Sequence, residues 1–133
     1  MAWLVLDDQL GASEVLGPIR KLIQAVRLRD LRPGERILDD RVPGVLLSLK
    51  DPMFITIDQG FWDRRYLHPG YCILYFALRD EQQELLPELL RRTLRARDFK
   101  TRAARRGKIG RVSRSGIDYW RLRSAVLHRV PWN

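Results

Sequence analysis

The fold is decided by the stretch MFITIDQGFW at residues 53–62. Apolar and β-branched residues fill its first half, which predicts a buried strand. A carboxylate, Asp58, follows this strand, and a turn that contains Gly60 comes next. Because ligands of open α/β sheets bind outside the carboxyl ends of the strands, an acid at this point is a candidate site residue.

A second stretch of the same form opens the chain. Residues 2–6 are almost continuously apolar, and Asp7 and Asp8 follow them directly. This pattern predicts a central strand that also ends in acids. Two strands that both end in Asp would bring carboxylates to one crevice at the edge of the sheet.

Between these two strands, the pattern predicts helix, strand and helix. Apolar residues recur every three or four positions over residues 13–26, with the dipeptide Gly17-Pro18 as an alternative helix start. Residues 26–31 alternate and predict a short strand. A short helix over residues 42–49 follows the acid cap Asp39-Asp40. This order is typical of an α/β fold with a mainly parallel sheet.

The second half of the chain continues this order. Residues 71–78 form a further apolar run, which predicts a strand that is buried on both faces. A helix is predicted over residues 81–95, but Pro87 requires either a kink or a start near Leu86. Two β-like runs, at residues 109–114 and 117–122, flank Ser115-Gly116 and predict a C-terminal β-hairpin.

The composition indicates one soluble domain that spans residues 1–133. The chain is 45% hydrophobic, enough for a substantial core. No apolar run approaches the roughly 20 residues of a membrane-spanning helix, and no signal-type segment precedes Asp7. We therefore expect a cytoplasmic protein without membrane association. The single cysteine, Cys72, excludes an intrachain disulfide and is expected to be a buried apolar residue.

The charge is divided unevenly along the chain. The net charge of +9 combines an acidic part, residues 1–90 with −3, and a basic part, residues 91–133 with +12. Residues 91–114 contain eleven Lys and Arg residues and one acid, Asp98. Such a surface suits the phosphates of a nucleic acid, and an acidic protein partner is the alternative. The candidate phosphate ligands are Arg102, Arg105, Arg106, Lys108 and Arg111.

The acids of the first part are expected to converge on the same crevice. They are Asp7, Asp8, Asp39, Asp40, Asp58 and Asp63. Carboxylates that lie close together repel one another, and a divalent cation relieves that repulsion. The cofactor expected from oxygen ligands of this kind is Mg²⁺ or Mn²⁺, whereas zinc is disfavoured because the chain has no HxxxH or CxxC pair.

These residues resemble the motifs of small PIN-like domains. LVLDDQL at residues 4–10 is similar to the opening motif of that family, and ITIDQGF at residues 55–61 is similar to its Thr-x-Asp strand. Asp40 precedes Asp58 by 18 residues, about where the family places the acid of its second helix. The resemblance covers roughly residues 2–78.

The resemblance implies a three-layer α/β fold and a Mg²⁺- or Mn²⁺-dependent ribonuclease, in a family that includes the toxins of toxin–antitoxin pairs. It matches Asp7 to the first metal ligand, Asp40 (or Asp39) to the helix acid, and Asp58 to the Thr-x-Asp ligand. Gly60 stands where many members carry another acid, and Asp63 is the candidate substitute. RNA is the implied substrate, and an antitoxin protein or a second copy of the chain is a candidate partner.

Two other functions compete with the nuclease. The first is a degenerate PIN-like module that binds nucleic acid or an acidic partner without cleavage, which Gly60 favours. The second is a response-regulator-like or phosphatase-like domain that uses Asp7, Asp8 and Asp58, although no lysine follows the late strand that ends at Leu78. Phe61 and Trp62 flank the crevice and could stack a base, but packing beneath the loop is the favoured role.

Overall fold

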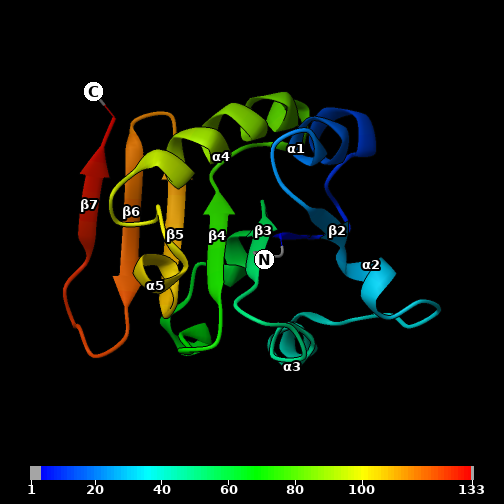
Figure 1. The fold of residues 1–133 in the computed structure, drawn as a ribbon, viewed down its shortest axis with the longest axis horizontal. Helices are drawn as coiled ribbons and strands as arrows, with labels where there is room; N and C mark the ends of the chain where they lie inside the picture. The colour runs from blue at the N-terminus through cyan, green and yellow to red at the C-terminus, as the bar shows by residue number, and fades with distance from the viewer. Residues whose placement is uncertain (1–3, 133) are drawn as a thin grey trace.

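Residues 4–132 of the protein are described by a computed structural model (Figure 1), and they form a seven-stranded mixed sheet. In sequence order the strands are β1 (Leu4–Leu6), β2 (Ala25–Arg27), β3 (Met53–Thr56), β4 (Cys72–Phe76), β5 (Lys108–Ser113), β6 (Gly116–Arg121) and β7 (His128–Pro131). The predicted first strand began at Ala2, but Ala2 and Trp3 lie outside the described residues.

The sheet has the spatial order β2-β1-β3-β4-β5-β6-β7. Strands β1 to β5 are parallel to one another, whereas β6 and β7 are antiparallel additions. The chain runs from β1 outward to β2, and then crosses back to β3 on the other side of β1. In doubly wound sheets this reversal of direction marks the ligand site, because the crossovers diverge there and leave a crevice.

The helices are short. They are α1 (Gly17–Arg20), α2 (Leu28–Leu31), α3 (Val42–Leu46), α4 (Leu86–Arg95) and α5 (Arg102–Arg105). The chain also contains one π-helical turn, η1 (Ala12–Leu16), and four 3₁₀ turns. The 3₁₀ turns are η2 (Asp39–Arg41), η3 (Gln59–Phe61), η4 (Arg64–Tyr66) and η5 (Asp80–Leu85). Within residues 4–132, no helix has both the length and the apolar character that a membrane crossing requires.

Side chains of the parallel strands alternate between two hydrophobic layers, as the period of two in a strand dictates. The first layer joins Leu6 and Leu74 to Ile19 of α1 and Leu90 of α4, and α4 crosses β4 and β5 on this side (Figure 1). The second layer joins residues such as Val5, Phe54, Leu46 and Phe61 from β1, β3, α3 and η3. The α/β class is therefore confirmed, with a sheet between two layers of helices and turns.

The predicted hairpin is also confirmed, with its turn one residue earlier than expected. Ser113 pairs with Gly116, so residues 114–115 form the two-residue connection. Gly116 has φ +150° and faces β7, where a Cβ atom would lie 2.4 Å from the carbonyl oxygen of Val130. A glycine is required here because any side chain would separate β6 from β7.

Some predicted elements differ from the structure. The alternating residues 26–31 divide into the end of β2 and the helix α2, because Asp30 accepts a hydrogen bond from the backbone N–H of Arg27 and caps a helical turn. The first helix is broken at Gly17 and ends at Arg20. Pro87 lies in the first turn of α4, which confirms the later of the two predicted helix starts.

Candidate functional site

Asp7 lies directly after β1 and is held in place by two hydrogen bonds. Its Oδ2 accepts a hydrogen bond from Thr56 Oγ1 (2.7 Å), and its Oδ1 accepts one from the backbone N–H of Asp8 (2.8 Å). Burial raises the pKa of Asp7 above its usual value of 3.8, and the charges of Asp58 and Asp8 add to this effect. The two hydrogen bonds act in the opposite direction. Asp7 is thus a fixed carboxylate whose charge is poorly compensated.

Thr56 links the acid of β1 to the acid that follows β3. Its side chain is fully buried, and its Oγ1 accepts a hydrogen bond from the backbone N–H of Asp58 (2.9 Å) while it donates to Asp7. The hydroxyl therefore uses both its donor and its acceptor capacity between the two acids. This explains in physical terms why threonine stands two residues before the acid in the stretch ITID.

Asp58 caps the turn in which the chain leaves β3. Its Oδ1 accepts a hydrogen bond from the backbone N–H of Gly60 (2.9 Å) and so caps η3. A Cβ atom on residue 60 would lie 3.2 Å from that same oxygen. A larger residue at this position would crowd the carboxylate, so Gly60 is compatible with the tight turn but supplies no ligand of its own.

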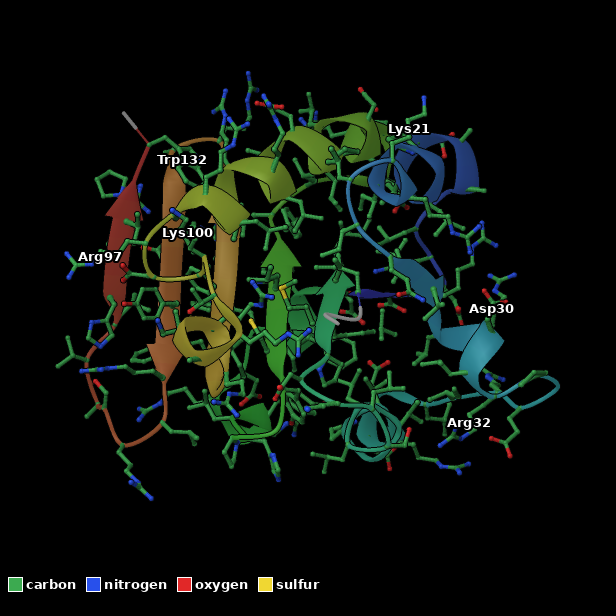
Figure 2. All side chains as sticks on the ribbon, viewed as in Figure 1. Lys21, Asp30, Arg32, Arg97, Lys100 and Trp132 are labelled. Atoms are coloured by element: carbon green, nitrogen blue, oxygen red, sulfur yellow. The ribbon has the colours of Figure 1, made fainter. Side chains whose placement is uncertain are left out.

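Asp39, the first residue of η2, faces Asp58. Desolvation raises the pKa of Asp39 even though the residue is exposed, and the nearby charges of Asp58 and Asp40 raise it further. Of the two acids that the sequence left as alternatives, Asp39 is therefore the one that we place in the site. Asp40 is exposed and lines a shallow hollow with Arg32, Arg41, Gly44 and Val45. In Figure 2, Arg32 lies at the end of α2.

The other two acids have local roles. Asp8 Oδ1 accepts a hydrogen bond from the backbone N–H of Arg29 (2.9 Å), and the side chain of Arg29 lies 3.4 Å from the same oxygen. Asp63 caps η4 through the backbone N–H of Arg65 (3.0 Å) and lies 3.4 Å from Nε of Arg65. Each acid is already partnered by a cation and by the backbone.

The predicted metal ligands Asp7, Asp40 and Asp58 are not assembled as a ready-made site. Across residues 4–132, no group of three or more His, Cys, Asp or Glu side chains could hold a metal ion as it stands. The donors that do converge, Asp58 with Asp39 and Asp7 with Thr56, are all oxygen donors. They fit a Mg²⁺ or Mn²⁺ ion in kind, because such ions are often held by one or two carboxylates and complete their coordination with water and substrate phosphate.

Two of the five predicted phosphate ligands have structural roles. Arg105 is only 7% exposed, and its Nη1 donates a hydrogen bond to the carbonyl oxygen of Phe99 (3.1 Å). Lys108 Nζ donates to the carbonyl oxygen of Asp98 (2.7 Å) and lies 4.7 Å from the centre of the Tyr119 ring. Neither side chain is presented to a ligand on the surface.

The other three are more accessible. Arg106 is 3.7 Å from Asp51, and Arg111 is 3.6 Å from Asp118. Arg102 is partly buried on α5. The acidic and basic candidates are thus distributed over the fold. Of these three arginines, only Arg111 stands on a strand, β5, whose carboxyl end reaches the edge that carries Asp7 and Asp58.

Thr56 in the site, together with Trp120 on β6 and Arg129 on β7, was not among the site residues predicted from the sequence. Thr56 could have been found from the Thr-x-Asp spacing, because that hydroxyl lies where it can bridge two acids. Trp120 and Arg129 gave no comparable signal, since their importance depends on strand pairing within the hairpin and with β7.

The comparisons with known proteins add no relative. No protein-family model, no curated protein and no solved structure matches the chain.

Proposed function

We propose that this protein is a PIN-like ribonuclease that depends on Mg²⁺ or Mn²⁺ and hydrolyses phosphodiester bonds of RNA. The observation that carries the proposal is the hydrogen-bonded series Asp7–Thr56–Asp58, with Asp39 against its far end, at the point where the strand order reverses. The motif resemblance of residues 4–10 and 55–61 agrees with it.

The carboxylates of Asp58 and Asp39 would hold the cation, and Asp7 would complete the site from the side of β1. A bound divalent cation supplies Lewis-acid stabilisation of the charge that develops on phosphate oxygens. Its positive charge would also compensate for the desolvation that raises the pKa values of Asp7 and Asp39, and for the repulsion by Asp58 that adds to it.

The residues of the chain hold the two carboxylates in fixed positions and supply a proton acceptor. Thr56 fixes the carboxylate of Asp7 by donating to Oδ2, so this group needs little reorganisation before reaction. The same hydrogen bond positions the carboxylate of Asp7 to accept a proton from an attacking water molecule. Asp58 is held through its own backbone and Gly60, so its position depends little on solvent.

The proposal is tested by cation-dependent stability and cleavage measured together. Millimolar Mn²⁺ should raise the melting temperature of the wild type, since a ligand bound only by the native state stabilises it by mass action. Asp58→Asn should lose that response and also any Mn²⁺-dependent cleavage of a labelled single-stranded RNA. Asp63→Asn, which changes the same charge in a loop acid partnered by Arg65, is the matched control and should keep both properties. Equal responses of the two variants would overturn the proposal.

A second candidate is a PIN-like module that binds RNA without cutting it. It is favoured by Gly60, which supplies no carboxylate, and by the lack of a ready-made group of three metal ligands in residues 4–132. Under this alternative the wild type binds RNA but cleaves none in Mn²⁺, and Asp7→Asn behaves like the wild type in every assay.

The response-regulator-like alternative has less support. Such a domain needs Asp8 beside a phosphorylated Asp58, but Asp8 is partnered by Arg29. The last parallel strand, β5, is followed by Arg114, where that alternative needs a lysine to contact phosphate.

A further inference from the structure

One face of β5, β6 and β7 is left without a hydrophobic layer. Of these three strands, only Ile109 belongs to the second hydrophobic layer, the one formed with α2, α3, η3 and η4. The opposite face of the same strands packs into the first layer through Val112, Ile117 and Tyr119. The hairpin and β7 therefore carry a sheet surface that extends beyond the turns covering β3 and β4.

The register of the sheet places a row of side chains across this surface. Thr56 pairs with Tyr75, Tyr75 with Arg111, Arg111 with Asp118, and Asp118 with Arg129. Paired residues point to the same face, so the row begins at the hydroxyl that binds Asp7 and ends on the edge strand β7. Neighbouring strands are about 4.8 Å apart, so Arg111 lies roughly 10 Å from the acidic site.

Arginines dominate the charge of this surface. Asp118 lies between Arg111 and Arg129, at 3.6 and 3.0 Å, and its side chain is only 18% exposed. The two arginine side chains remain 39% and 43% exposed. One partly buried carboxylate thus orients two guanidinium groups, and the three side chains together carry a net positive charge.

Two tryptophans flank the arginines on the same face. Trp120 is paired with Ile109, and its ring centre lies 6.4 Å from that of Trp62 with a 30° angle between the planes. Both side chains are partly exposed. The guanidinium of Arg64 lies 4.7 Å from the centre of the Trp120 ring, and its Nη2 donates to the carbonyl oxygen of Ser124 in the β6–β7 connection. Arg64 therefore holds an aromatic platform at the surface.

We propose that this face, formed by Trp62, Arg64, Arg111, Asp118, Trp120 and Arg129, binds single-stranded RNA and leads it to the acidic site. The inference rests on the proposed function in naming RNA as the ligand. Aromatic rings that stack bases, together with cations that follow the backbone, are the general means of binding single strands. A duplex fits poorly, because its bases are already stacked and unavailable to Trp62 and Trp120.

The test uses a labelled oligouridine and the full-length protein in EDTA, so that binding is separated from cleavage. Arg111→Gln/Arg129→Gln should weaken affinity and flatten the slope of log affinity against log salt by about 1.4, which is 0.7 for each lost phosphate contact. Arg97→Gln/Lys100→Gln removes the same charge from exposed positions between α4 and α5 (Figure 2) and should leave the slope unchanged. Asp118→Asn should tighten binding, because it removes the negative charge between the two arginines while an amide oxygen remains to accept their hydrogen bonds.

The aromatic contribution is tested in the same assay. Trp120→Leu should weaken binding about 5- to 150-fold, the range expected for one lost stacking contact, and Trp120→Phe should retain part of the affinity. Trp132→Leu is the matched control, since Trp132 packs against the first hydrophobic layer on the opposite face (Figure 2). An unlabelled duplex should compete poorly with the oligouridine.

The binding and cleavage results together distinguish the proposed RNA-binding face from the proposed nuclease activity. Single-strand binding that depends on Arg111, Arg129 and Trp120 but is not followed by cleavage in Mn²⁺ supports the surface and contradicts the nuclease. Cleavage that is unchanged in Arg111→Gln/Arg129→Gln and in Trp120→Leu contradicts the surface alone. Equal losses of RNA affinity in the matched control variants, or no binding of single-stranded RNA at low salt, would also overturn the proposed RNA-binding face.

Discussion

Thr56 Oγ1 donates a hydrogen bond to Asp7 Oδ2 over 2.7 Å, and this contact joins two parallel strands through their side chains. The carboxylate is partly buried, so its charge lacks full hydration. The hydroxyl supplies part of the missing compensation, and the remaining deficit shows as the raised pKa of Asp7. A partly desolvated carboxylate lowers the free energy of unfolding, and this loss of stability can be measured.

Asp7→Asn should stabilise the protein at neutral pH. Because the folded-state pKa of Asp7 is raised above 3.8, the native state holds more protons than the unfolded state between these two values. The free energy of unfolding of the wild type therefore falls as the pH rises through this window, and the full penalty remains at neutral pH. Urea denaturation at several pH values should show Asp7→Asn more stable at pH 7 and the difference vanishing below pH 3.8. A variant less stable than wild type at pH 7 would contradict this account.

Thr56→Val should destabilise the protein by about 1–3 kcal/mol at neutral pH, because it leaves a partly buried carboxylate oxygen and the backbone N–H of Asp58 without their partner. Thr56→Ser keeps the hydroxyl and serves as the control, with a smaller loss from the deleted methyl group. The destabilisation by valine should shrink at acidic pH, where Asp7 is protonated. Equal losses for Val and Ser would mean that packing, and not the hydrogen bond, is what Thr56 contributes.

The variants Asp39→Asn and Asp40→Asn make the same change in charge, and they show which of the two neighbouring acids contributes to cation binding. Both residues are exposed, but Asp39 lies near the charge of Asp58, whereas Asp40 lines the hollow beside Arg32. Asp39→Asn should therefore reduce the rise in melting temperature that Mn²⁺ produces, and Asp40→Asn should leave it unchanged. The reverse result would restore the position that the motif spacing assigns to Asp40.

The sequence was sufficient to predict the central strands β1, β3 and β4, and the acids that follow β1 and β3. The apolar runs at residues 53–56 and 72–76 leave little alternative to buried parallel strands, and an acid directly after such a strand is placed by the fold itself. That is why Asp7 and Asp58 could be expected at one edge of the sheet before any coordinates were known.

The remaining features depend on tertiary context. Residues 28–31 alternate as a strand would, but the cap formed by Asp30 stabilises a helical turn there. Arg105 lies in a run of charges, which usually indicates a solvated face, yet its side chain is buried beneath the carbonyl of Phe99. Strand β7 is a short edge strand whose pairing with β6 no local pattern indicates. Trp120 meets Trp62 only because the hairpin is added to the parallel sheet.

Cys72 should be unreactive in the native protein. It was expected to be buried from its apolar neighbours, and its side chain is 1% exposed. Desolvation raises the pKa of the Cys72 thiol to about 12, so very little thiolate is present at neutral pH. A chromogenic thiol reagent should modify the protein only as fast as it unfolds, and modification in urea should follow the loss of helical circular dichroism. Rapid labelling without denaturant would show that β4 opens locally.

Arg105→Met tests whether Arg105 has a structural role or is one of the phosphate ligands, as predicted from the sequence. Burial lowers the pKa of Arg105, and its Nε has no hydrogen-bond partner in the described part of the chain. Methionine fills a similar volume without a buried charge, so we expect only a small change in melting temperature, whereas Arg105→Ala should destabilise the fold by creating a cavity. The slope of log RNA affinity against log salt should be unchanged in Arg105→Met, because a guanidinium group beneath the surface makes no phosphate contact. A slope that falls by about 0.7 in this variant would show that Arg105 reaches the phosphate after all.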